Sequence, residues 1–240
     1  MDIADFSVGA MLRVGIAVRR ILRNAETIEE SANLIVRYLY EHCVDSTTGE
    51  RNCALVRFYK THRYGSLDGD LKEFADNLLG ETPAWPDMRC LVLLGTAGDE
   101  QEWNSRQASQ SHRAIPLPAV SAVRAAPMIA HLIEDLGIDI DSVVSGATPT
   151  RRTNARTYDV FHVEHASGSP LIPAQDFVAR HRIASVVGFG GLLRSGELYA
   201  VILFSRTPVA PSSAARFRTI ALDIRSSLFL LDESKTWMTT

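Results

Sequence analysis

The sequence contains no uninterrupted apolar stretch of the roughly 20 residues that a helix needs to cross a bilayer, so we expect no membrane partner. Cysteine is scarce as well. Cys43, Cys53 and Cys90 are odd in number and widely spaced, which excludes a disulfide framework or a zinc-ligand set. We therefore expect a reducing, cytoplasmic compartment. Cys53 and Cys90 lie in apolar, strand-like runs, where a free and buried thiol is the ordinary outcome.

No sign of charge dominates the chain. Lys and Arg number 25 against 28 Asp and Glu, which gives a net charge of -3 and no basic footprint for a nucleic acid. The N-terminus carries acidic residues before its apolar part and arginines after it, the wrong polarity for a secretory signal. Hydrophobic residues make up 46% of the chain, which is ordinary for a soluble globular protein with a filled core.

Catalytic motifs are absent too. The sequence has no GxSxG, HExxH, CxxC or GK[ST] pattern, and no pair of catalytic carboxylates can be identified. The run Gly188-Phe-Gly-Gly191 lies inside an apolar stretch and not at a strand-to-helix turn, so we interpret its glycines as bulge or close-packing positions. The sequence therefore predicts a protein that is not an enzyme.

The clearest positive signal lies in residues 183–205. An apolar, β-branched run over 183–193 is followed by Arg194-Ser195-Gly196-Glu197 and by a second apolar run over 198–205. Gly196 can supply the positive φ of a tight turn, so the pattern predicts a β-hairpin. Both strands are apolar at almost every position, which predicts a central place in a sheet that is covered on both faces.

An amphipathic helix is predicted after this hairpin, over residues 212–232. Pro208 and Pro211 interrupt the preceding strand, and Ser212 or Ser213 can cap the helix. An apolar stripe then recurs at steps of three and four residues, except for one gap at Ser227: Phe217, Ile220, Ile224 and Leu231. The stripe suits packing on the domain's own sheet and pairing with a second copy equally well.

A buried hairpin, a polar segment and a long exit helix in this order resemble the end of a GAF domain. The resemblance is strongest over residues 183–231 and extends to residues 27–60. It implies an α+β fold of GAF/PAS type, in which a central antiparallel sheet of five or six strands carries helices on its faces. It also implies a sensory domain that binds a small molecule or cofactor and relays the signal through its terminal helices to a dimer partner or an output domain.

The remaining periodicities agree with such a fold. Further strands are predicted over residues 53–60, 90–95 and 158–163, and further helices over 8–23, 27–42, 71–79, 121–137 and 175–181. Pro127 begins or kinks its helix, and residues 141–156 are expected to form an exposed loop.

The helices near the two ends of the chain are expected to pack together on one face. In the helix over 27–42, which Thr27 and Glu30 can cap, the residues expected to point inward are Ile28, Ala32, Ile35 and Leu39. In the helix over 8–23 a broad apolar face is formed by Val8, Met11, Leu12, Ile16 and Leu22.

For the domain boundaries we expect an N-terminal helix over 1–26, a single GAF-like domain over 27–232 and a tail over 233–240. The tail looks like the place where a longer chain was cut.

Residues 96–118 form a long polar segment without a clear period, and loops of this length are often functional. The segment contains Trp103, Arg106, His112 and Arg113. Arginine forks and an aromatic face suit an anionic or planar ligand, so we predict that this segment covers a ligand pocket. The alternative is a solvated loop whose tryptophan fills the core.

Two histidines complete the predicted ligand-binding residues. His131 lies beside apolar helix positions and fits equally a half-buried histidine with a backbone partner. His162 belongs to His162-Val-Glu-His165, which suggests a metal or haem site, but on a strand His162 and His165 point to opposite faces unless the strand ends at Val163. We therefore predict no metal site, keep both histidines as weak candidates, and leave the cofactor open, haem included.

Four functional hypotheses remain, of which the last, an enzyme, has no catalytic motif to support it. The first is the ligand-binding sensory domain, acting as a homodimer through its terminal helices. The second is a non-binding dimerisation or scaffolding module of the same fold, and the third is a haem or redox sensor that uses histidines or a cysteine. In GAF domains that bind a bilin covalently, a Cys is often followed directly by His. None of the three cysteines has this pattern, which argues against a covalently bound bilin.

Overall fold

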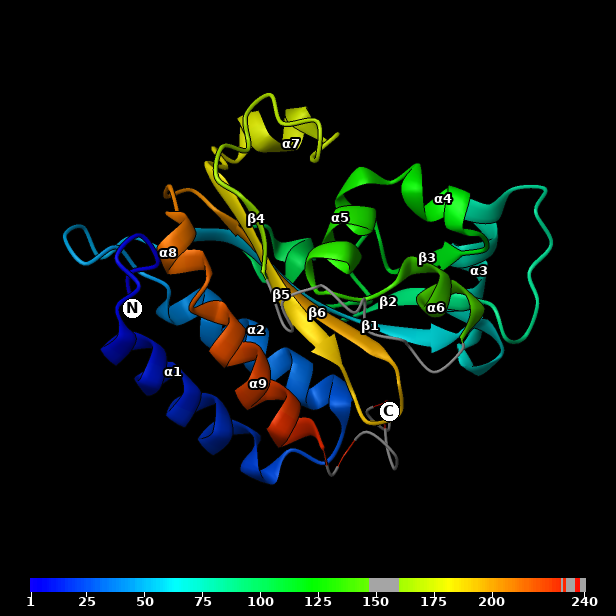
Figure 1. Cartoon of the computed structure of the whole chain (residues 1–240), viewed down its shortest axis with the longest axis horizontal. Helices are drawn as coiled ribbons and strands as arrows, with labels where there is room; N and C mark the ends of the chain where they lie inside the picture. The colour runs from blue at the N-terminus through cyan, green and yellow to red at the C-terminus, as the bar shows by residue number, and fades with distance from the viewer. Residues whose placement is uncertain (147–159, 230, 232–235, 238–240) are drawn as a thin grey trace.

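The computed structural model describes residues 1–146, 160–229, 231 and 236–237. Its centre is one antiparallel sheet of six strands in the order β3-β2-β1-β6-β5-β4 (Figure 1). The strands are β1 Cys53–Arg63, β2 Arg89–Gly98, β3 Ala114–Leu117, β4 Phe161–Val163, β5 Ser185–Leu192 and β6 Leu198–Ser205. The predicted α+β fold with a central antiparallel sheet is confirmed.

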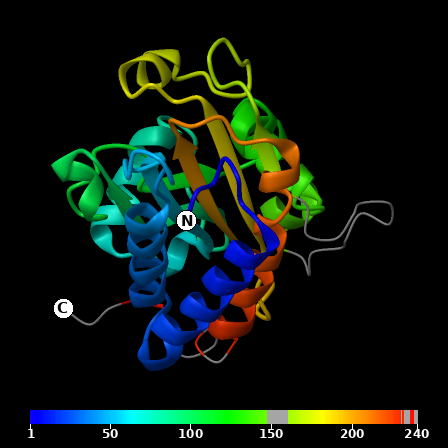
Figure 2. The ribbon, with the colours of Figure 1, turned by 90° about the vertical axis from the view of Figure 1, so that its left-hand side faces the viewer.

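Helices cover both faces of this sheet (Figures 1 and 2). One face carries α1 Val8–Ile21, α2 Ile28–His42, α8 Pro211–Ala214 and α9 Phe217–Leu228, with α3 Gly69–Leu79 beside β3. The other face carries α4 Val120–Arg124, α5 Pro127–Asp135, α6 Ile140–Ser145 and α7 Gln175–Arg180. Short 3-10 turns occupy Leu22–Asn24, Tyr64–Ser66 and Gln101–Asn104. In the described residues, no helix is both long and apolar enough to span a bilayer.

The predicted hairpin is formed by β5 and β6. Leu192 pairs with Leu198 next to the turn, and Gly196 adopts the expected positive φ of 83°. The side chains of β6 alternate between two hydrophobic clusters, one under α9 and one under α5. The hairpin is therefore covered on both faces, as its apolar runs predicted.

The terminal helices pack together on one face, also as predicted. All four expected inward residues of α2 are completely buried, and Thr27 caps α2 by accepting a hydrogen bond from Glu30 N at 3.0 Å. Gly95 lets α2 approach β2 closely, because a Cβ at that position would lie 2.6 Å from the carbonyl carbon of Ala32. The stripe on α9 points into the core at Phe217, Ile220 and Ile224 and so packs on the domain's own sheet.

The orientation of α1 differs from the broad apolar face in its sequence. The helix buries a narrow face instead, made of Ala10, Val14 and Val18. Three of its larger apolar residues are exposed by 56, 56 and 60%: Val8, Leu12 and Ile16. The reason is the contact with α9, where the absent Cβ of Gly15 leaves room for the Asp223 carboxylate and thereby fixes which side of α1 faces inward.

Other differences concern the ends and breaks of elements. The helix predicted over 121–137 is two helices, and Pro127 begins the second of them, where its missing N–H costs no hydrogen bond. Part of the loop expected over 141–156 is helix α6, which Asp139 caps by accepting from Ser142 N at 2.9 Å. Strand β3 was not predicted, because Pro116 suits only an edge strand. Residues 147–159 lie outside the described part.

Glycines in β5 serve close packing, as predicted. A Cβ on Gly188 would lie 2.7 Å from Leu132 Cδ1, and one on Gly190 would collide with the backbone of Tyr199. The absence of a side chain at Gly188 therefore allows Leu132 of α5 to pack closely against the sheet.

Candidate ligand pocket

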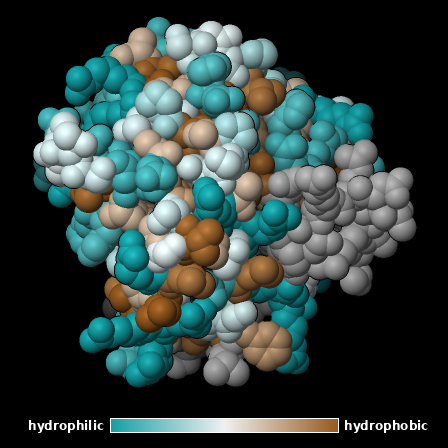
Figure 3. Space-filling view, turned by 60° about the vertical axis from the view of Figure 1, so that its left-hand side comes forward, coloured by the Kyte–Doolittle hydropathy of each residue, from teal (hydrophilic) through white to brown (hydrophobic). Residues whose placement is uncertain are grey.

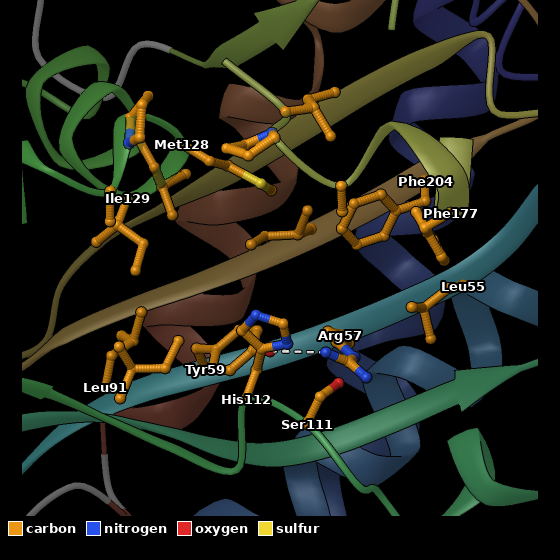
Figure 4. Close-up of a pocket in the computed structure, with 18 of the residues that line it drawn as sticks. Leu55, Arg57, Tyr59, Leu91, Ser111, His112, Met128, Ile129, Phe177 and Phe204 are labelled. Atoms are coloured by element: carbon orange, nitrogen blue, oxygen red, sulfur yellow. Dashed lines mark hydrogen bonds between the residues drawn. The ribbon is translucent and has the colours of Figure 1, made fainter. Parts of the chain in front are cut away.

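A pocket of about 460 Å³ lies between the sheet and helices α5 and α7 (Figure 4). Its volume is in the lower part of the range of roughly 300–1,000 Å³ that small-molecule sites occupy. Strands β1, β2 and β6 supply the floor, while α5 and α7 supply the walls. Much of the lining is apolar, including Leu55, Leu91, Met128, Leu132, Phe177 and Ile202.

Strand alternation brings the polar end of the pocket together. Residues two apart on a strand share a face, so Leu55, Arg57 and Tyr59 all point into the pocket. The residues between them, Val56 and Phe58, belong to the hydrophobic cluster on the opposite face, under α2. A single strand therefore contributes to the core on one side and to the pocket on the other.

Arg57 is the most unusual residue of the pocket. It is only 7% exposed, although arginine keeps its charge at every physiological pH. Its Nη1 donates to Tyr59 Oη at 3.2 Å and its Nη2 donates to Ser109 Oγ at 3.4 Å, while its Nε has no hydrogen-bond partner among residues 1–146, 160–229, 231 and 236–237. No carboxylate oxygen of the described residues lies within 4.0 Å of the guanidinium.

His112 stands beside this guanidinium. Figure 4 shows Arg57, Ser111 and His112 pointing toward one another at one end of the pocket. The backbone of His112 has a φ of 59°, in the left-handed region that non-glycine residues rarely adopt. Crowding by protein atoms and the charge of Arg57 lower the pKa of His112, so the ring is neutral at pH 7 and offers one donor and one acceptor.

The segment between β2 and β3 is held by ion pairs at Arg106 and Arg113. Arg106, which is 9% exposed, donates from Nε to Glu29 of α2 at 3.0 Å, and Arg113 pairs with Asp70 of α3. Trp103 packs edge-on against Phe177, with 5.8 Å between ring centroids, and so joins this segment to α7. The segment is therefore a fixed wall of the pocket.

The structure separates the residues that the sequence predicted as ligand-binding. Trp103 and His112 line the pocket, whereas Arg106 and Arg113 anchor the wall from outside it. His131 is exposed on α5.

His162 of β4 points elsewhere as well. Its ring donates from Nε2 to Val209 O at 2.8 Å, which places the proton on that nitrogen. Burial lowers the pKa of His162, partly offset by this hydrogen bond, so its ring serves as a neutral structural donor.

Sequence reasoning missed Arg57 and Ser111. For Arg57 a signal was present, because it is a charged residue in the middle of the otherwise apolar run CALVRFYK. A buried charge at such a position is expected to have a charged partner or to bind a ligand, since burying it unpaired costs free energy.

The residues considered for metal, haem or redox chemistry do not form a cluster. Strand β4 does end at Val163, but His165 is exposed beyond it, and no group of three or more His, Cys, Asp or Glu in the described residues could hold a metal ion. The three cysteines are free and buried, as predicted for Cys53 and Cys90. Burial raises the pKa of Cys90 to about 12 and also raises that of Cys43, so these thiols stay protonated and weakly nucleophilic.

Comparisons with known proteins concern the fold. No protein-family model matches the chain, and no curated protein matches it. Among solved structures, it is similar to the GAF domain of a phosphoenolpyruvate-protein phosphotransferase from Coxiella burnetii, with a TM-score of 0.47, 10% identity, and coverage of 91% of this chain and 92% of that one.

Two more structures illustrate the range of similar proteins. The free methionine-R-sulfoxide reductase from Neisseria meningitidis, in complex with its substrate, gives a TM-score of 0.47 at 11% identity, covering 96% of this chain and 97% of that one. The phycoerythrobilin-bound GAF domain of a cyanobacterial phytochrome gives 0.45 at 10%, covering 91% and 94%. These similarities concern the arrangement of helices and strands, and the chemistry of this chain has to be argued from its own residues.

Proposed function

We propose that this chain is a regulatory domain, not an enzyme, that binds a small molecule in the pocket between the sheet and helices α5 and α7. The observation that carries the proposal is the pocket itself, about 460 Å³ of space with a mainly apolar lining and a few polar groups gathered at one end. Sites for small organic ligands have this composition. In a scaffolding module of the same fold, we would expect side chains of the domain to fill this space.

The binding experiment uses N-phenyl-1-naphthylamine, an uncharged probe whose fluorescence rises in apolar surroundings. Met128 is a half-buried residue of the pocket wall, so Met128→Trp should fill the space without disturbing the deep core. We expect probe affinity to fall at least about tenfold, the equivalent of 1.4 kcal/mol. Leu78→Trp on the exposed side of α3 is the matched control. No binding to the unmodified protein, or equal binding to both variants, would contradict the proposed pocket.

The terminal helices are proposed to relay pocket occupancy to a second copy of the chain or to an output domain, in a cytoplasmic setting. Strand β1 offers the connection, because Arg57 and Tyr59 face the pocket while Val56 and Phe58 contact the cluster under α2. A ligand that shifts β1 would therefore push on the helices across the sheet.

An apolar surface on these helices supports pairing with a second copy. Figure 3 shows apolar side chains gathered on this side of the molecule. The exposed residues are Val8, Leu12 and Ile16 of α1, with Leu222 of the neighbouring helix α9 and Phe229 directly after it. Large apolar residues that recur every four positions on an exposed helix face are typical of an interface.

Sedimentation velocity tests the pairing. We expect the unmodified chain to sediment as a dimer and Leu12→Glu as a folded monomer. Leu78→Glu is a control of equal exposure, since Leu12 is 56% and Leu78 55% exposed, but Leu78 lies on α3. A monomeric unmodified chain at high protein concentration would refute the dimer and leave the pocket proposal standing.

A further inference from the structure

The three most deeply buried arginines of the described chain differ in how their charges are balanced. Arg89 and Arg106 are each 9% exposed, and each pairs with a carboxylate, Glu197 and Glu29 respectively. Arg57 is 7% exposed and pairs with none in the described residues. Within the described residues, two of the three buried guanidinium groups are neutralised by a carboxylate, and the third, which faces the pocket, has no counter-charge.

The hydrogen bonds of Arg57 do not replace that counter-charge. They reach two neutral hydroxyl groups, at 3.2 and 3.4 Å, at or beyond the long end of the usual N–H···O range of roughly 2.7–3.2 Å. Its Nε makes no hydrogen bond to the part of the chain that the structure describes. A buried charge is costly unless it is paired, and arginine cannot escape the cost by losing its proton. An anion that enters the pocket would remove this cost.

The other polar groups nearby suit the same anion. Tyr59 and Ser111 carry hydroxyl groups, and the neutral ring of His112 has an N–H to donate. The opposite part of the pocket is apolar, with Met128 and Leu132 from α5. A ligand that uses both parts needs a negative group at one end and an apolar body at the other.

We propose that the pocket selects a small organic acid, whose carboxylate binds Arg57 and whose apolar body packs against α5 and α7. This inference rests on the proposed function, because it names the ligand class of the same site. Arginine is suited to the task, since its planar N–H fork matches the two oxygens of a carboxylate. The closely spaced donors favour a single compact negative group over a neutral amide or an amine.

The experiment compares two competitors that share one body. After N-phenyl-1-naphthylamine has been bound, it is displaced with 4-phenylbutanoate or with 4-phenylbutanamide, which differ only in the charged group. We expect half-displacement by the acid at a concentration at least about tenfold lower than by the amide, as expected for a charge-assisted bidentate contact. This comparison uses the unmodified protein and so does not depend on any variant folding.

A variant then assigns the preference to one residue. Arg57→Met keeps an unbranched apolar stem and removes the charged guanidinium, so it should abolish the advantage of the acid while the uncharged probe still binds. Arg124→Met, at an exposed position on α4 that does not line the pocket, is the matched control and should keep the advantage. Circular dichroism confirms that each variant is folded.

The outcomes separate this inference from the function on which it rests. If the probe binds and the acid is preferred only when Arg57 is present, the ligand class is supported. If the probe binds in the pocket but acid and amide displace it equally, or neither displaces it, the acid proposal is overturned and the pocket proposal stands. If the probe does not bind, or Met128→Trp leaves its binding unchanged, both proposals fall.

Discussion

The buried ion pair between Arg106 and Glu29 connects the pocket wall to α2, and its removal should destabilise the domain measurably. The two side chains are 9% and 3% exposed, with Arg106 Nε 3.0 Å from Glu29 Oε1. Asp68 is a second neighbour of Arg106 at 3.6 Å, but it is 51% exposed and contributes little. Removing one partner of a buried pair costs about 3–5 kcal/mol, because the other charge stays behind.

For Arg106→Met we therefore expect a loss of about 3 kcal/mol in the free energy of unfolding. In a chain of this size that corresponds to a melting temperature lower by roughly 6–12 °C, from about 2–4 °C per kcal/mol. Urea titration followed by circular dichroism measures the free energy, and a constant slope with urea shows that the compactness of the unfolded state is unchanged. Arg63→Met is the control, since Arg63 and Asp87 form an exposed pair worth at most about 1 kcal/mol.

A double-mutant cycle shows that the pairing, and not the lost packing, is responsible. Adding Glu29→Leu to Arg106→Met also removes the buried carboxylate that Arg106 no longer faces, so the double variant should recover part of the loss and give a coupling of at least about 1 kcal/mol. The reasoning is refuted if Arg106→Met costs no more than Arg63→Met, or if the two substitutions at Glu29 and Arg106 are simply additive.

The remaining predictions concern pH and packing. Burial and nearby positive charges hold the pKa of His62 well below its usual 6.5, so the unfolded chain binds the proton more readily and stability falls as the pH drops below about 6.5. His62→Phe should remove part of this slope between pH 7 and 5, as followed by urea titration at each pH. Gly95→Ala should cost about 1–3 kcal/mol in urea titrations, because its Cβ meets the Ala32 backbone. Gly69→Ala, with open space around it, should cost nothing, and an equal loss in both would contradict this account.

Local signals explain which parts of the fold could be predicted. The hairpin follows from two apolar runs around Gly196, and the inward face of α2 follows from spacing between a capped start and the next strand. The face of α1 could not be predicted in the same way, because the helix has apolar residues on more than one side. Its contact with Asp223, more than 200 residues away in sequence, decides which side is buried.

In the candidate site, too, local sequence signals predicted some features and tertiary contacts decided the others. The sequence alone shows a charged residue, Arg57, inside an apolar strand, and a polar segment after β2 that contains Arg106, His112 and Arg113. Alternation along a strand is a local rule, so it also determined that Arg57 and Tyr59 share a face. Which arginine would meet a carboxylate depended on the tertiary structure. Among the described residues, folding brings Glu29 to Arg106 and places hydroxyl groups, an imidazole and apolar walls around Arg57. Glu29 and Arg106 are 77 residues apart in the sequence, so only packing could bring them together.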